Sequence, residues 1–138
     1  MITVKNLSYR YRKSNDFALE KLNFSIERGE IFGFLGPSGA GKSTTQKILY
    51  KILTDYQGEV LIDGQSLDSL GKDYYTRIGV GFELPNHYMK LSARENLKLF
   101  GSFYPKEKLQ NLEGLFDIVG MKEHIDKRVE DYSKGMKM

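Results

Sequence analysis

The chain has 138 residues, with 21 basic and 18 acidic side chains and a net charge of +3. Its length fits at most one domain, and a composition of 40% hydrophobic and 28% charged residues fits a globular fold and excludes general disorder. The lack of cysteine excludes disulfides and thiolate metal sites, the small charge excess does not favour a nucleic-acid partner, and no apolar run is long enough to span a membrane.

The first part of the chain has the pattern of β-strands. Alternating apolar residues predict strands over 2–11 and 18–27, with a polar turn between them. The run Ile31-Phe32-Gly33-Phe34-Leu35 is apolar on both faces. Such a run is typical of a buried strand in a parallel sheet, so the sequence predicts one over 31–35.

Helical spacing begins at Lys42. It predicts a helix over 42–53, which Gly58 ends. A strand is predicted over 59–63, and the apolar run over 78–82 predicts another. Two further helices are predicted over 92–104 and 105–120. The first of these has the Ser-x-x-Glu pattern of a capping box, and the second starts with Pro and stops at Gly.

One motif carries chemistry. Residues 36–44 read GPSGAGKST, which fits the pattern G-x-x-x-x-G-K-[ST], and an apolar run precedes it while an amphipathic helix follows it. Glycines let backbone amides approach a triphosphate, and the start of a helix favours negative charge. The residues expected to hold the phosphates are Gly36, Pro37, Ser38, Gly39, Ala40, Gly41, Lys42, Ser43 and Thr44.

Two of these residues have distinct expected roles. Lys42 is expected to reach the β- and γ-phosphates as a point charge and to stabilise them catalytically, and the Ser43 hydroxyl is a suitable ligand for Mg²⁺. ATP and Mg²⁺ are therefore the expected cofactors. The motif alone indicates a nucleotide-binding superfamily and not a reaction.

Across almost its whole length, the chain resembles the N-terminal part of the nucleotide-binding domain of an ABC transporter. The opening segment VKNLSYRY resembles the family's first strand, which ends in an aromatic residue that stacks on adenine. Tyr11 is the matching position, with Tyr9 as the alternative. The resemblance implies an α/β fold with a P-loop core containing a parallel sheet, an antiparallel β layer and a helical segment.

The segment IGVGFELPNHYMKLSARENL resembles the family's Q-loop region. The resemblance implies that Glu83 stands where the family has Gln, as a possible Mg²⁺ ligand, and that the loop after it contacts membrane-spanning permease subunits. An exposed loop carboxylate without a metal role is the alternative.

The segment DYSKGMK resembles a variant of the family's signature sequence. The resemblance implies that Ser133 and Gly135 contact the γ-phosphate bound to a second ATP-binding domain, in a homodimer or a heterodimer. In this variant Lys134 and Met136 replace the usual Gly and Gln.

The family's Walker B strand and catalytic Glu normally follow the signature, and no apolar run ending in Asp-Glu occurs here. We therefore expect a partial ABC-type domain, with a nucleotide-binding core over 1–90 and a helical segment over 91–138. We also expect slow ATP hydrolysis by these residues alone. His87 and His124 have no partner at metal-ligand spacing.

The expected function is that of an ABC transporter ATPase subunit at the inner face of the cell membrane, closer to exporters than to importers. A soluble ABC-type ATPase without a membrane partner and a fragment unable to hydrolyse ATP remain alternatives. A different P-loop enzyme, such as a kinase, is a third.

Overall fold

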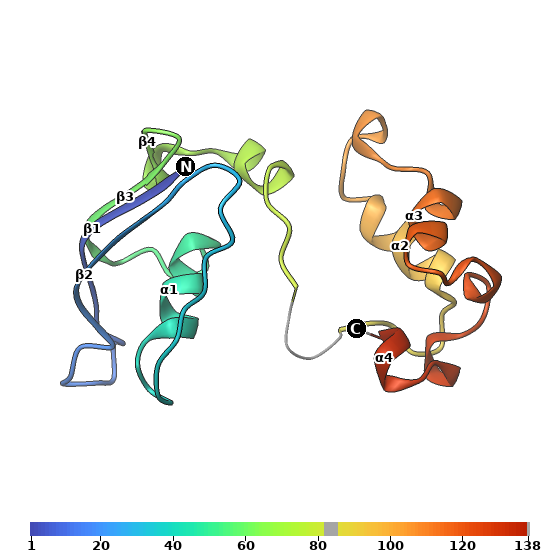
Figure 1. Ribbon diagram of the computed structural model, residues 1–138, viewed down its shortest axis with the longest axis horizontal. Helices are drawn as coiled ribbons and strands as arrows, with labels where there is room; N and C mark the ends of the chain where they lie inside the picture. Colours follow the sequence, from blue (N-terminus) through green and yellow to red (C-terminus); the bar gives the residue numbers. More distant parts are fainter. Residues whose placement is uncertain (82–85, 138) are drawn as a thin grey trace. The chain divides into compact units, whose positions relative to one another are not determined.

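The computed structural model describes residues 1–81 and 86–137. The chain forms two compact units, Met1–Tyr74 and Tyr75–Met138. The predicted nucleotide-binding core over 1–90 and helical segment over 91–138 are a functional division and stay a prediction. Figure 1 shows strands and a helix in the first unit and helices in the second, which confirms the predicted α/β class.

The first unit contains a four-stranded antiparallel sheet with the strand order β2-β1-β3-β4. Its strands are β1 (Ile2–Tyr9), β2 (Leu19–Ile26), β3 (Gln57–Ile62) and β4 (Gln65–Ser66). The first three confirm the strands predicted over 2–11, 18–27 and 59–63.

The central strand β1 supplies much of the unit's core. Val4 pairs with Phe24 on one side and Val60 on the other. Val4, Leu7 and Val60 are almost fully buried. The pairing register of β1 shifts between Val4 and Leu7, and Leu7, Ser8 and Tyr9 are buried in succession, so burial along this strand does not alternate strictly.

The helix after the motif is shorter than its apolar spacing predicts. Helix α1 (Lys42–Leu49) ends before Lys51, whose φ is +57°. The amides of Lys51 and Ile52 donate to the carbonyls of Ile48 and Lys47 at 2.8 and 2.9 Å. This bonding pattern is a Schellman motif, which ends a helix even though no glycine occupies the left-handed position.

The predicted strand over 31–35 is wrong, because this segment is irregular and both Ile31 and Leu35 are exposed. The rings of Phe32 and Phe34 do pack on Phe24 of β2, with centroids 5.4 and 5.3 Å away. The run is therefore anchored by its aromatic residues. A strand also needs a hydrogen-bonded neighbour, and among residues 1–81 and 86–137 none pairs with it.

The predicted strand over 78–82 is also wrong for residues 78–81, which are irregular, while residue 82 lies outside the described part. Since every strand pair in the described ranges is antiparallel, the parallel sheet that the sequence predicted is not formed there. Both wrong predictions concern apolar runs whose strand state depends on a partner strand.

The second unit contains three α-helices, α2 (Ala93–Gly101), α3 (Leu112–Ile118) and α4 (Lys134–Lys137), in its described residues. The predicted capping box at the start of α2 is confirmed. The Ser92 side chain accepts a hydrogen bond from the Glu95 amide, and the Glu95 carboxylate accepts one from the Ser92 amide. Helix α3 begins after Asn111 instead of at Pro105, and a single 3₁₀ turn occupies 106–108.

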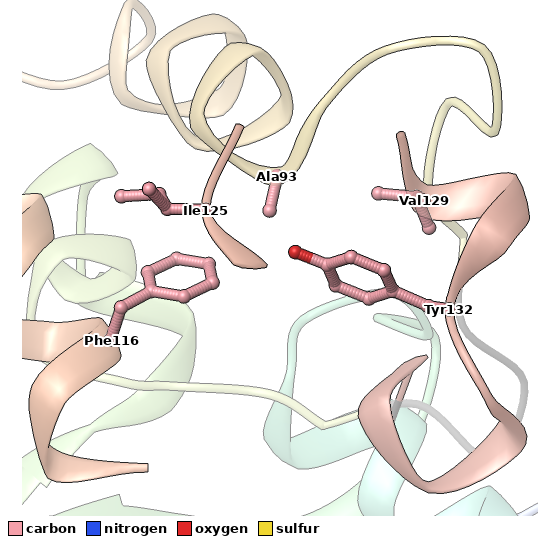
Figure 2. Packing of buried hydrophobic residues seen from close by; sticks show 5 residues of the cluster. All are labelled: Ala93, Phe116, Ile125, Val129 and Tyr132. Atoms are coloured by element: carbon pink, nitrogen blue, oxygen red, sulfur yellow. The ribbon is translucent and has the colours of Figure 1, made fainter. Parts of the chain in front are cut away.

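Five buried residues form the core of this unit, as Figure 2 shows: Ala93, Phe116, Ile125, Val129 and Tyr132. The rings of Phe116 and Tyr132 enter the cluster from opposite sides (Figure 2). The Tyr132 hydroxyl donates to the His124 carbonyl at 2.6 Å, so its polar end is satisfied inside the core.

A buried amide orders the segment that precedes α2. The Oδ1 atom of Asn96 accepts from the Tyr88 amide at 2.8 Å, and its Nδ2 donates to the carbonyls of Tyr88 and Ser92 at 3.0 and 2.9 Å. Asn96 is only 3% exposed. Its side chain therefore acts as a template for the backbone of residues 88–92.

Candidate nucleotide-binding site

The phosphate-loop motif forms a turn that leads into α1. The Ala40 amide donates to the Pro37 carbonyl at 3.2 Å, and Gly39 and Gly41 both have a φ of +85°. Gly41 is the residue before the first helical residue, Lys42. Two left-handed glycines thus turn the chain sharply within the loop.

The start of α1 leaves hydrogen-bond donors free. Within the described ranges, the amides of Gly41, Lys42 and Ser43 donate to no acceptor, and no side chain caps this helix. Helix N-termini with free amides and an aligned dipole are suited to anions. The loop therefore offers the donor set that a phosphate group requires.

The Lys42 side chain folds back over the loop. Its ammonium group donates to the carbonyls of Gly36 and Pro37, at 2.7 Å in both cases. Those two bonds leave one ammonium proton for another acceptor. The charge predicted to contact phosphates is therefore held against the loop itself.

Gly41 also lies against the start of β2. A Cβ atom on Gly41 would be 2.4 Å from Cδ2 of Leu19 and 2.6 Å from the Ala18 carbonyl oxygen. Such distances are far below van der Waals contact. A side chain at this position would therefore displace either the loop or the strand.

Tyr11 lies close to the same helix. Its hydroxyl is 3.1 Å from Oγ1 of Thr44, in the first turn of α1, and its ring meets that of Tyr9 edge-on at 5.0 Å. An open hollow of about 480 Å³ adjoins it, lined by Tyr9, Tyr11, Arg12, Lys13 and residues 52–55. The structure thus brings together Tyr11 and the phosphate loop, which sequence reasoning had connected only through the family resemblance.

The two signature-like residues lie in the second unit. Ser133 directly precedes α4, and its Oγ accepts from the Met136 amide at 3.3 Å. Ser133 and Gly135 are both exposed, and a Cβ on Gly135 would meet nothing within 4 Å. Both residues are therefore accessible to a molecule from outside this unit.

Of the two predicted Mg²⁺ ligands, Ser43 and Glu83, only Ser43 lies among the described residues. Ser43 is exposed at the start of α1, whereas Glu83 lies outside the described residues. In the part of the chain that the structure describes, no cluster of three or more His, Asp or Glu side chains could hold a metal ion. The described helices also include none long and apolar enough to cross a membrane.

Sequence reasoning missed two residues of structural weight. It assigned Thr44 only to phosphate binding, although Thr44 also contacts Tyr11, and it did not single out Asn96. Both contacts are made to residues whose proximity only the folded chain reveals. No local spacing signal marks either residue.

Comparison with known proteins gives consistent matches. The family model for ABC transporters matches residues 19–138. A fluoroquinolones export ATP-binding protein of Mycobacterium tuberculosis is 46% identical over 100% of this chain and 46% of its own length. The bacitracin transport ATP-binding protein BcrA of Bacillus licheniformis is 34% identical over 87% of this chain and 39% of its own. The chain thus spans about half the length of these curated relatives.

Solved structures agree with the sequence matches. One is cbiO1 from Clostridium perfringens, part of the ABC transporter complex cbiONQ, with a TM-score of 0.82, 28% identity and coverage of 99% of this chain and 57% of that one. Another is a dimeric ATP-binding cassette in a post-hydrolysis state bound to ADP and Pi. It has a TM-score of 0.75, 27% identity and coverage of 99% and 65%. These likenesses confirm the predicted P-loop fold class. Together with the family match, they show that the chain belongs to the ABC transporter family and resembles its ATP-binding proteins.

Proposed function

We propose that this chain binds ATP with Mg²⁺ as part of the ATP-binding subunit of an ABC transporter. The observation that carries the proposal is the loop over 36–41, where free amides at the start of α1 and the Lys42 ammonium converge on one short segment. A triphosphate needs dense positive potential without bulky side chains, and this loop supplies both conditions.

The residues would divide the work as follows. The amides of Gly41, Lys42 and Ser43 would hold the phosphate oxygens, and the Lys42 ammonium would exchange a loop carbonyl for a β- or γ-phosphate oxygen. The Ser43 hydroxyl would hold Mg²⁺, which neutralises phosphate charge when bound. Tyr11 would stack on the adenine ring. These roles concern positioning and charge, which dominate phosphoryl transfer.

Titration calorimetry of ATP·Mg binding to the purified chain tests this proposal. We expect Lys42→Ala to weaken binding by roughly ten- to a hundredfold, because a hydrogen bond to a charged group is lost. Lys47→Ala is the matched control, since Lys47 is an exposed lysine of the same helix. Equal affinity of the wild type and Lys42→Ala would contradict the proposed site.

We further propose that the whole protein acts with a second ATP-binding domain and with membrane-spanning subunits in export. In this arrangement Ser133 and Gly135 would face the nucleotide of the partner domain, and the loop after Glu83 would contact the permease. The name of the Bacillus relative supports a transport role, and the name of the Mycobacterium relative favours export. Affinity purification from cells would test it: recovered membrane subunits support transport, and recovered ribosomes without them would contradict it.

A further inference from the structure

The hydroxyl pair between Tyr11 and Thr44 joins two parts of the site that lie 33 residues apart in the sequence. Thr44 is only 7% exposed and is fixed in the first turn of α1. Its Oγ1 lies 3.1 Å from the Tyr11 hydroxyl. A buried side chain of α1 thus contacts the hydroxyl of a partly exposed ring.

Two further contacts restrain Tyr11. Its carbonyl accepts a hydrogen bond from the Ser14 amide at 2.9 Å, which fixes the backbone beyond β1. The ring meets Tyr9 at an interplanar angle of 89°, so Tyr9 contacts it edge-to-face. Tyr11 nevertheless remains 38% exposed. Tyr11 is therefore restrained at three points: its backbone carbonyl, its ring edge-to-face with Tyr9, and its hydroxyl. Part of the ring surface remains exposed to solvent.

We propose that Thr44 is a positioning residue for the Tyr11 ring, which it locks to the phosphate-binding helix before a nucleotide arrives. This inference rests on the proposed function and deepens it. A ring fixed in advance loses less conformational freedom when a purine base stacks on it, so the lock strengthens base binding and leaves phosphate binding unchanged. Base recognition and phosphate recognition are thereby linked through one hydroxyl pair.

A double-mutant cycle separates these two effects. The variants are Tyr11→Phe, Thr44→Val and the double variant, each titrated with ATP·Mg and with inorganic triphosphate·Mg. We expect Tyr11→Phe to weaken ATP binding about three- to tenfold without changing triphosphate binding, because one hydrogen bond is lost. Thr44→Val should weaken ATP binding more than triphosphate binding.

The decisive quantity is the ATP affinity of each variant divided by its triphosphate affinity. For the double variant this ratio should equal that of Tyr11→Phe, because both substitutions break the same hydroxyl pair. Thr44→Ser keeps the hydroxyl and should restore the wild-type ratio. Tyr104→Phe serves as the control, since Tyr104 is an exposed tyrosine whose side chain makes no hydrogen bond in the described part of the chain.

Three results would overturn the inference. The first is an ATP affinity of Tyr11→Phe equal to that of the wild type, and the second is a fold-loss of ATP affinity in the double variant equal to the product of the two single fold-losses. The third is an equal fold-loss of ATP affinity and triphosphate affinity in Thr44→Val. If Thr44→Val does not fold, Tyr11→Phe and Thr44→Ser still decide. If the wild type binds triphosphate and Tyr11→Phe loses no ATP affinity, only the positioning role of Thr44 is refuted. A wild type that binds neither probe refutes the proposed function together with it.

Discussion

Gly41 lies where the phosphate loop meets β2, and two independent constraints act on it. Its φ is +85°, and an added Cβ would approach Leu19 to 2.4 Å and the Ala18 carbonyl to 2.6 Å. We expect Gly41→Ala to lower the free energy of unfolding by about 1–3 kcal/mol and to abolish measurable ATP binding, because the loop must move to admit the methyl group.

Thermal denaturation and calorimetry would check this expectation. Gly33→Ala is the control, since a Cβ at Gly33 meets nothing within 4 Å. Wild-type stability and affinity in Gly41→Ala would show that the close contact with β2 does not shape the site.

Individual site residues differ in how far local sequence predicts them. The motif over 36–44 is defined within nine consecutive residues by glycines, a lysine and a hydroxyl, so its turn into α1 could be predicted from local sequence, while its phosphate contacts stay a prediction. The Tyr11–Thr44 pair was not, because its members meet only after β1, β2 and α1 have formed. Tyr11 itself was named from the resemblance to a family and not from its own surroundings.

Among the elements, α2 is tied to the rest of its unit by an ion-pair network. Arg94 donates to Asp126 at 2.7 Å and also to Glu113 of α3. The hydrogen bond from Arg94 lowers the pKa of the Asp126 carboxyl and that of the Glu113 carboxyl below their usual values. Two carboxylates thus favour the folded chain only while they are ionised.

The pH dependence follows from the direction of these shifts. A carboxyl whose pKa is lower in the folded state stabilises the fold above its unfolded pKa of about 4, and this contribution is lost as the pH falls below that value. We expect Asp126→Asn to lower the melting temperature at pH 7 and to have little effect near pH 2.5. Melting curves at both pH values would check it, and an equal effect at both would contradict the ionic role.

The helices and strands that were predicted correctly carry their signals in their own sequences. Helix α2 carries its capping box in its own sequence, and the apolar residues of β1 and β2 recur with roughly the period of a strand, so these elements were predicted. The run 31–35 has the composition of a buried strand, but strand formation needs neighbours that composition does not encode. Helix α1 ends early through backbone bonds around Lys51, a residue type that gives no stop signal.

For the molecule as a whole, binding and hydrolysis of ATP place different demands on the chain. The donors proposed for phosphate binding lie within residues 36–44. Phosphoryl transfer also needs a group that orients or deprotonates the attacking water. The family resemblance assigns this task to a Glu after an apolar strand ending in Asp, and no Asp-Glu pair occurs in these 138 residues.

We therefore expect the purified 138-residue polypeptide to bind ATP while releasing phosphate far more slowly than about one turnover per second, the lower end of ordinary enzyme rates. Phosphate release by the wild type and by Lys42→Ala, measured at saturating ATP·Mg, would check this. If both release phosphate at the same low rate while only the wild type binds ATP tightly, binding and chemistry are separable in this chain. Lys42-dependent turnover near one per second would instead show that residues 1–138 already contain a group that activates water, and Glu83 would then be the first carboxylate to substitute.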